Sequence, residues 1–105
     1  MSELIIITTT SDAKEVLEQV ADRLVADRLA ACCQVSQPIK SIYRWNGQVE
    51  SSAEFELKIK TAAAKFDEVS TVIKSLHNYD VPQIVAVDMT HVDAAYRDWA
   101  KANLS

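Results

Sequence analysis

The spacing of apolar residues predicts an alternation of strands and helices along the chain. Leu4–Thr9 begins with four apolar residues in a row, which is typical of a strand that is buried on both faces. Apolar side chains then recur every three or four positions from Ala13 to Leu29 and again from Ala64 to Leu76, so both segments are predicted to be helices. Asp12 and Glu15 resemble a capping box at the start of the first helix.

Three further segments have the period of two that is typical of strands. Gln48–Thr61 alternates apolar and polar residues, so one face is expected in the core and the other in water or against a polar partner. The expected core positions of this strand are Val49, Ala53, Phe55, Leu57 and Ile59. Ala30–Ser36 and Ile39–Trp45 are separated by Pro38, which predicts one strand with a break or a bulge. Ile84–Met89 is the last predicted strand.

The only glycine of the chain marks a hairpin. Gly47 follows Asn46 between two strand-like runs, and both residues of a tight type I′ turn need positive φ, which Asn and Gly adopt readily. His77–Pro82 is a predicted loop, since its proline cannot continue a helix. A third, shorter helix is expected at Ala94–Asn103, with Thr90 as its N-cap.

The predicted order is β-α-β-β-α-β plus a terminal helix, which is the ferredoxin-like α+β arrangement with an antiparallel sheet. We interpret residues 1–105 as a single domain of this type. Right-handed crossovers place both long helices on one face of the sheet. The first strand is nevertheless apolar on both sides, so the uncovered face is expected to pack on other copies of the chain.

Composition narrows the classes of partner. The formal net charge is −4, which argues against nucleic acid, because phosphate binding needs a basic face. No apolar run reaches the roughly 20 residues of a membrane helix, and the N-terminus lacks the features of a signal peptide, so we expect a cytoplasmic protein without membrane contact. The adjacent Cys32 and Cys33 are expected to be free thiols, as the cytosol would keep them.

No catalytic motif is present. The chain has no nucleophile elbow, and a single glycine cannot build a glycine-rich phosphate loop, so we do not predict an enzyme. His77 is the best candidate metal ligand, because imidazole suits copper and zinc. It also follows a predicted helix, where a cation would interact favourably with the helix dipole. Cys32 is the second candidate, although a buried thiol usually packs as a small apolar side chain. Cys33 is about as strong a candidate metal ligand as Cys32, and His91 is better explained as a surface or capping residue.

Two aromatic side chains of the hairpin allow two interpretations. Tyr43 and Trp45 share one strand parity, so they face the same side and either pack between subunits or form the wall of a cleft. Glu54 and Lys60 lie on the polar row of the opposite strand, where a surface charge pair would contribute only about 0–1 kcal/mol.

Several short motifs together resemble one family, the CutA divalent-cation-tolerance proteins, from about residue 5 to residue 99. The matching segments are Arg28–Cys32, Ser41/Tyr43/Trp45/Gly47, Glu54, Ile59–Thr61, His77/Tyr79/Pro82 and Tyr96/Trp99. The resemblance implies a ferredoxin-like fold, a compact homotrimer and a link to metal tolerance, with copper binding proposed for some members. It also implies that Glu54 and Lys60 line a cleft together with Tyr79 and Gln83.

The chain departs from the family pattern at five positions. The family often has proline at the positions of Ser11 and Asn78, and glutamate where this chain has Gln83. Some members have cysteine in place of Thr8 and histidine in place of Leu76. The loss of the carboxylate at position 83 weakens a metal or cation role that depends on it.

Three hypotheses follow. The first is a CutA-like homotrimer that needs no cofactor and holds a ligand, such as copper or another divalent metal ion, in clefts between subunits. The alternative is a signalling trimer like the nitrogen-regulatory PII proteins, which share the architecture, bind a small anionic metabolite or nucleotide and act on a partner protein. The third is a structural trimer that sequesters metal weakly.

Overall fold

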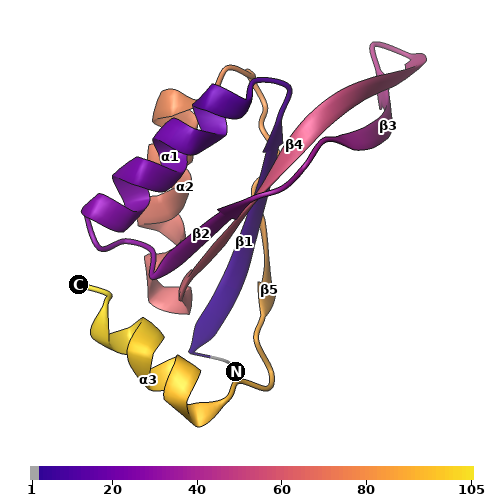
Figure 1. The fold of residues 1–105 in the computed structure, drawn as a ribbon. Coiled ribbons are helices and arrows are strands. Elements are labelled where there is room, and N and C mark those ends of the chain that lie inside the picture. Colours follow the sequence, from indigo (N-terminus) through magenta and orange to yellow (C-terminus); the bar gives the residue numbers. More distant parts are fainter. Residues whose placement is uncertain (1–2) are drawn as a thin grey trace.

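The computed structural model describes residues 3–105 and has the predicted order of elements (Figure 1). The elements are β1 (Leu4–Ser11), α1 (Lys14–Ala26), β2 (Cys32–Val35), β3 (Ile39–Trp45), β4 (Gln48–Ala62), the 3-10 helix η1 (Ala63–Lys65), α2 (Phe66–Leu76), β5 (Val85–Asp88) and α3 (Ala94–Ala102). The βαββαβ arrangement with a terminal helix is therefore confirmed.

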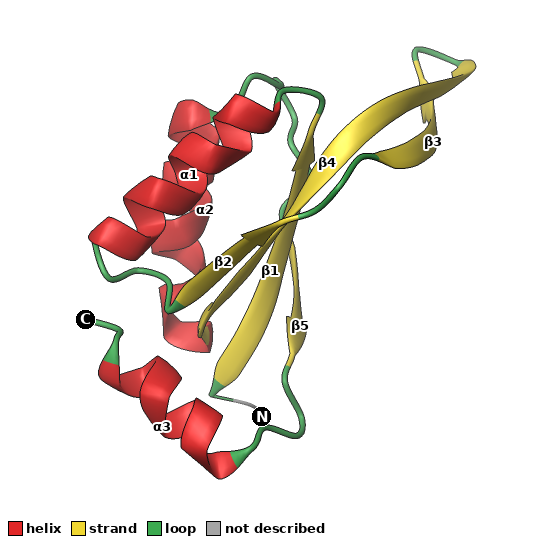
Figure 2. Cartoon of the chain, viewed as in Figure 1, coloured by secondary structure: helices red, strands yellow, loops and turns green. Residues whose placement is uncertain are grey.

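The strands form one antiparallel sheet with the order β2-β4-β1-β5, and β3 pairs with the remaining length of β4. Helices α1 and α2 lie side by side on one face of this sheet (Figure 2). The main core lies between these helices and the sheet. It consists of Ile5, Ile7, Leu17, Val20, Leu24, Ala30, Leu57, Ile59, Val69 and Ile73.

The strand that contains β2 and β3 carries one extra residue relative to β4. Val35 pairs with Leu57 and Ile39 pairs with Glu54, so three residues on one strand oppose two on the other. A bulge of this kind exchanges the two faces of the strand beyond it. As a result Tyr43, although odd-numbered, lies on the same face as the even-numbered residues of β4.

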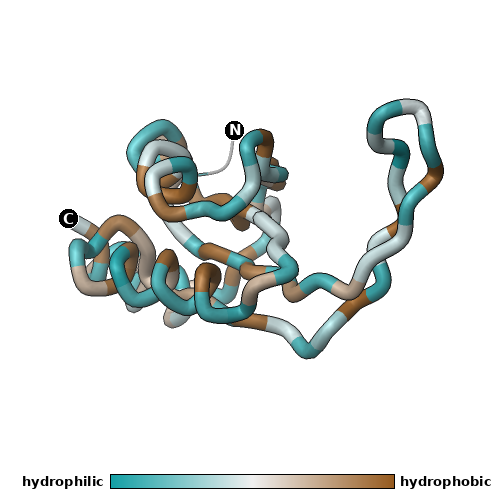
Figure 3. The backbone as a smooth tube through the Cα atoms, turned by 90° about the horizontal axis from the view of Figure 1, so that it is seen from above, coloured by the Kyte–Doolittle hydropathy of each residue, from teal (hydrophilic) through white to brown (hydrophobic). Residues whose placement is uncertain are grey.

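Strand β4 is longer than the sheet that the helices cover. Its Phe55–Ala62 segment pairs with β1, whereas Gln48–Glu54 pairs only with β3. The hairpin therefore projects beyond the helices (Figure 3). Val49 and Ala53 are exposed, so the prediction that they lie in the core is wrong, because no helix reaches their part of the strand.

The hairpin turn has the predicted geometry. Asn46 has a φ of 50° and Gly47 a φ of 77°, while Trp45 pairs with Gln48. Two positive φ values in a two-residue loop are the requirement of the type I′ turn.

The second face of the sheet is only partly covered. Helix α3 packs across one end of it, where Ala100 contacts Leu4 and Ala31. Beyond this contact, Val85 and Val87 on β5 remain 51% and 62% exposed. No helix of residues 3–105 is long and apolar enough to span a membrane.

Both ends of helix α1 differ from the prediction. Helix α1 ends at Ala26 instead of Leu29, because the chain turns through Arg28, whose φ is 59°. The predicted capping box of Asp12 and Glu15 is wrong, since Ala13 is the N-cap and has no side-chain hydrogen bond.

The cap of the last helix and the bounds of the last strand also differ from the prediction. Asp93, instead of Thr90, caps α3 by accepting the N–H groups of Ala95 and Tyr96. Strand β5 is shorter than Ile84–Met89 by one residue at each end. The Asp93 carboxylate is the cap of α3 because it accepts hydrogen bonds from two of the otherwise unpaired N–H groups of the first turn.

The turn geometry yields a stability prediction. Gly47→Ala places a Cβ in open space, so its cost comes only from the positive φ. We expect a loss of about 1 kcal/mol in the free energy of unfolding, measured by urea denaturation. Asn46→Gly is the control, because glycine tolerates the same φ; a change within about 0.5 kcal/mol is expected. Equal stability of Gly47→Ala and the unmodified protein would contradict the assigned turn.

Candidate functional site

A hollow of about 710 Å³ lies between the β3–β4 hairpin and the loop that follows α2. Its lining residues are Thr10, Ser41, Ile42, Tyr43, Arg44, Trp45, Glu54, Tyr79, Asp80, Val81, Pro82 and Gln83. The structure thus brings together Glu54, Tyr79 and Gln83, which are predicted to line a cleft, with Tyr43 and Trp45, for which a cleft wall is one of two interpretations. Their role in binding stays a prediction.

The wall formed by the hairpin is aromatic and open to solvent. The bulge after β2 places Tyr43 and Trp45 on the face of the hairpin that also carries Glu54. Tyr43 is 43% exposed and Trp45 is 55% exposed. Large aromatic surfaces of this kind are typical of interfaces and of ligand-binding walls.

Glu54 is the buried acidic group of the hollow. Only 6% of the residue is exposed, and its Oε2 accepts the hydroxyl proton of Tyr79 at 2.6 Å. The Tyr79 oxygen accepts in turn the backbone N–H of Asp12 at 2.9 Å. This pair of hydrogen bonds connects the hairpin, the loop after α2 and the turn between β1 and α1.

The environment keeps Tyr79 protonated. Burial raises the pKa of its hydroxyl, and the hydrogen bond to the Glu54 carboxylate raises this pKa further. The neutral hydroxyl therefore remains the donor to Glu54 well above neutral pH.

His77 holds the loop in place through both of its ring nitrogens. Its Nε2 lies 2.8 Å from the carbonyl oxygen of Thr10, and its Nδ1 accepts the backbone N–H of Tyr79 at 3.0 Å. The second bond requires an unprotonated Nδ1, so the first is a donation from Nε2–H. Both ring nitrogens thus have backbone partners.

Ser11 and Asn78, two residues that depart from the family pattern, contact each other at the turn between β1 and α1. The Ser11 hydroxyl donates to Oδ1 of Asn78 at 2.7 Å, and Nδ2 of Asn78 donates to Oδ1 of Asp12 at 2.8 Å. Ser11 Oγ also accepts the N–H of Ala13 at 3.0 Å. Proline at either position could make none of these side-chain bonds, which connect the loop after α2 to the turn between β1 and α1.

The two candidate metal ligands are not brought together in one chain. The His77 ring contacts Thr10, which pairs with Glu56, whereas Cys32 pairs with Lys60. Four positions along a strand correspond to about 13 Å. Within residues 3–105, no group of three or more histidine, cysteine, aspartate and glutamate side chains could hold a metal ion.

The two neighbouring thiols face different surroundings. Cys33 lies on the helix side of β2, and burial raises the pKa of its thiol to about 12, with a smaller contribution from Cys32. A thiol of this kind is a packing residue, because the thiolate is the reactive form. Cys32 lies on the face of β2 that α1 and α2 leave uncovered.

Lys60 is the predicted cleft residue that the hollow does not include. It lies six positions from Glu54 along β4, or about 20 Å. Its Nζ lies 5.7 Å from the centre of the Tyr96 ring on α3. Within one chain, Lys60 therefore belongs to the α3 end of the sheet.

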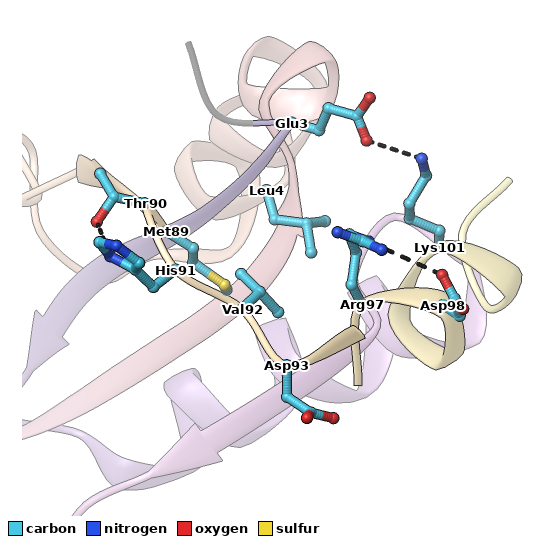
Figure 4. A pocket seen from close by; sticks show the side chains of 10 residues that line it. All are labelled: Glu3, Leu4, Met89, Thr90, His91, Val92, Asp93, Arg97, Asp98 and Lys101. Carbon is cyan, nitrogen blue, oxygen red and sulfur yellow. Dashed lines mark hydrogen bonds and ion pairs between the residues drawn. The ribbon is translucent and has the colours of Figure 1, made fainter. Parts of the chain in front are cut away.

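A second hollow of about 880 Å³ lies between the start of β1, the segment after β5 and helix α3 (Figure 4). Its charged groups are largely paired with one another. Lys101 donates to Glu3 at 2.7 Å, and Arg97 lies 3.8 Å from Asp98. His91 Nδ1 lies 3.2 Å from the Thr90 hydroxyl. These internal pairs make this hollow a less suitable ligand site than the one beneath the hairpin.

The hydroxyl of Tyr79 gives a test of the site's architecture. Tyr79→Phe removes one donor to a buried carboxylate and one acceptor for a backbone N–H, so we expect a loss of about 1–3 kcal/mol in unfolding free energy at pH 7. Tyr43→Phe is the matched control, because that hydroxyl has one exposed partner, Ser52, at 3.3 Å. It should change stability by less than about 0.5 kcal/mol.

The same variant has a predicted pH signature. The folded pKa of Tyr79 lies above the ordinary 10.0, so the unfolded chain loses this proton first as the pH rises. The stabilisation is complete below pH 10.0 and declines above it. The stability of Tyr79→Phe should therefore fall less steeply above this pH, as measured by urea unfolding. Parallel curves would contradict the assignment.

The chain matches the family described as CutA1 divalent ion tolerance protein over residues 4–103. It is 39% identical over 103 residues to the divalent-cation tolerance protein CutA of Thermus thermophilus, with 98% of each chain covered. The corresponding protein of Archaeoglobus fulgidus is 37% identical over 90 residues, which cover 86% of this chain and 87% of that protein.

Solved structures give the same result. CutA1 from Oryza sativa superposes with a TM-score of 0.94 at 31% identity, covering 99% of this chain and 95% of that one. The Archaeoglobus fulgidus structure, described as a periplasmic divalent cation tolerance protein, superposes with a TM-score of 0.93 at 33% identity, covering 97% and 99%. On this evidence the chain belongs to the CutA1 divalent ion tolerance protein family.

Proposed function

We propose that this chain is one subunit of a homotrimeric binding protein with a role in divalent-cation tolerance. Neighbouring copies would cover the open face of the sheet and complete the hollow beneath the hairpin as a cleft between subunits. The completed cleft would bind a small ligand without chemical conversion. The cytoplasm is the location that we propose, in keeping with two free cysteines.

The observation that supports this proposal most strongly is the apolar surface on the strands of a single chain. Val85 and Val87 line the open face, and the hairpin adds Ile42, Trp45 and Val49, all of them exposed. The register places Trp45 on the same side as Val85 and Val87, and Ile42 and Val49 on the opposite side of the hairpin. Both sides therefore carry exposed apolar residues, which are typical of interaction sites.

The chemistry of the described side chains favours binding over catalysis. Both ring nitrogens of His77 are used by backbone groups, so this residue is not placed to activate a nucleophile. The raised pKa of Cys33 makes this thiol a poor nucleophile.

Copper, the metal that the family resemblance suggests, does not fit a site within one chain. Transition metals need several converging nitrogen or sulfur ligands, whereas His77 is engaged and Cys32 lies elsewhere on the sheet. Cys32 remains the candidate for a metal shared between copies, because its face is the one that the trimer would bury.

The charges in the hollow argue against the PII-like alternative. An anionic metabolite would need a basic cleft. The residues that line the hollow include one cation, Arg44, and two with carboxylates, Glu54 and Asp80. A ligand with positive charge is better suited to this set than a phosphate or a nucleotide.

Trp45 reports directly on the proposed interface. In a Trp99→Phe background it is the only tryptophan, and it is 55% exposed in the single chain. We expect acrylamide to quench its fluorescence weakly, because a neighbouring copy would bury it. Trp45→Ala should then cost several kcal/mol of stability, as for other large-to-small changes in buried sites. Quenching as strong as that of a free indole, with little change in stability, would contradict the interface.

A copper titration separates the metal hypotheses. The unmodified protein, His77→Ala and Cys32→Ala would be titrated with Cu²⁺ and followed by calorimetry. We expect His77→Ala to bind as the unmodified protein does while its loop is destabilised, because the imidazole makes two backbone hydrogen bonds. Reduced binding in Cys32→Ala would support a shared site. A selective loss of binding in His77→Ala would contradict the assigned role of this ring.

A further inference from the structure

We infer that the hollow beneath the hairpin is a site for a small organic cation, with an ammonium group on Glu54 and an apolar part against Tyr43. This inference rests on the proposed function, because it names the class of ligand for the same cleft.

Glu54 lacks a cationic partner in the part of the chain that the structure describes. The ion pairs of residues 3–105 are Arg23–Asp27, Lys58–Glu56, Arg97–Asp98 and Lys101–Glu3. The single side-chain hydrogen bond of Glu54 comes from the neutral hydroxyl of Tyr79. The residue is only 6% exposed, and a carboxylate in such surroundings gains from a positive partner, because burial weakens its hydration.

One oxygen of this carboxylate remains available to a ligand. Tyr79 bonds to Oε2, and Oε1 has no partner among residues 3–105. Oε1 is also not fully enclosed, since the only enclosed side-chain atom without a partner in this range is Thr9 Oγ1. Because Glu54 lines the hollow, the free oxygen provides an acceptor at its wall.

The other walls suit the carbon skeleton and the charge of an organic cation. Tyr43 contributes aromatic surface, since its hydroxyl lies 3.3 Å from Ser52, two positions from Glu54, and Val81 and Pro82 contribute aliphatic surface from the opposite loop. A cation over an aromatic face is stabilised by about 0.5–2 kcal/mol. A buried carboxylate beside such faces is the arrangement that recognises an ammonium group with an apolar substituent.

Other ligand classes fit less well. A metal ion would need more anionic or imidazole ligands than the hollow supplies, since no suitable cluster occurs in residues 3–105. An anion would find one cation, Arg44, whose Nη1 lies 3.5 Å from the carbonyl oxygen of Gly47. A neutral apolar molecule would bury Glu54 further without giving it a partner.

The test compares n-butylammonium with n-butanol, which has a similar shape and no charge. Binding to the intact protein is measured by calorimetry at pH 7 and constant ionic strength. Because hydrogen bonds to charged groups contribute about 1.5–3 kcal/mol, butanol is expected to bind at least about tenfold more weakly. Equal affinity for the two probes, or no binding of n-butylammonium, would overturn the inference.

Two variants locate the effect. Glu54→Gln removes the charge and still accepts the hydroxyl proton of Tyr79, so the fold should persist while n-butylammonium binding falls at least about tenfold. Glu50→Gln is the matched control: it lies on the same face of β4, is exposed and does not line the hollow. The affinity of Glu50→Gln for n-butylammonium should stay within about twofold of that of the unmodified protein. Equal losses in both variants would overturn the site.

The result of this binding test can be distinguished from the result of a test of the proposed trimer. The molar mass of each sample is measured by light scattering before titration. A trimer that does not bind n-butylammonium leaves the assembly intact and overturns the ligand class, as would be found if a lysine or arginine of a second copy occupied Glu54. A monomer whose n-butylammonium binding depends on Glu54 supports the ligand class and contradicts the assembly.

Discussion

The structure depends on a mismatch between the length of β4 and the surface that the helices cover. Antiparallel pairing with β1 holds Phe55–Ala62 over the main core, and the same strand then continues to Gln48, paired only with β3. Side chains of the extension cannot be buried by α1 or α2, so the hairpin presents apolar and aromatic surface to its surroundings. Together with the partly covered second face of the sheet, this surface leaves a single copy incomplete.

The candidate site follows from the same mismatch. The projecting hairpin leaves a hollow against the loop after α2, and polar contacts fix the position of that loop. His77 bonds to the end of β1, Asn78 to the turn before α1, and Tyr79 to Glu54. The first contact satisfies a backbone carbonyl near the end of β1, and the other two join polar side chains. The loop is thereby rigid enough to form one wall of a binding site.

Local chemistry explains which parts the sequence predicted. The hairpin followed from Asn46-Gly47, and the shared face of Tyr43 and Trp45 followed from strand parity. The role of His77 was not predictable, since its partner Thr10 lies 67 positions away and offers only a backbone carbonyl. The Ser11–Asn78 contact spans the same separation. The place of Lys60 in a cleft between subunits stays a prediction, because within one chain this residue lies at the α3 end of the sheet.

The central claim is that one copy of the chain is completed by two others. Sedimentation equilibrium measures this most directly, because it gives the mass in solution without a shape assumption. The account predicts a species of about 35 kDa, three times the chain mass of 11.7 kDa, that persists on dilution to micromolar concentration. A folded species of 11.7 kDa at those concentrations would contradict it.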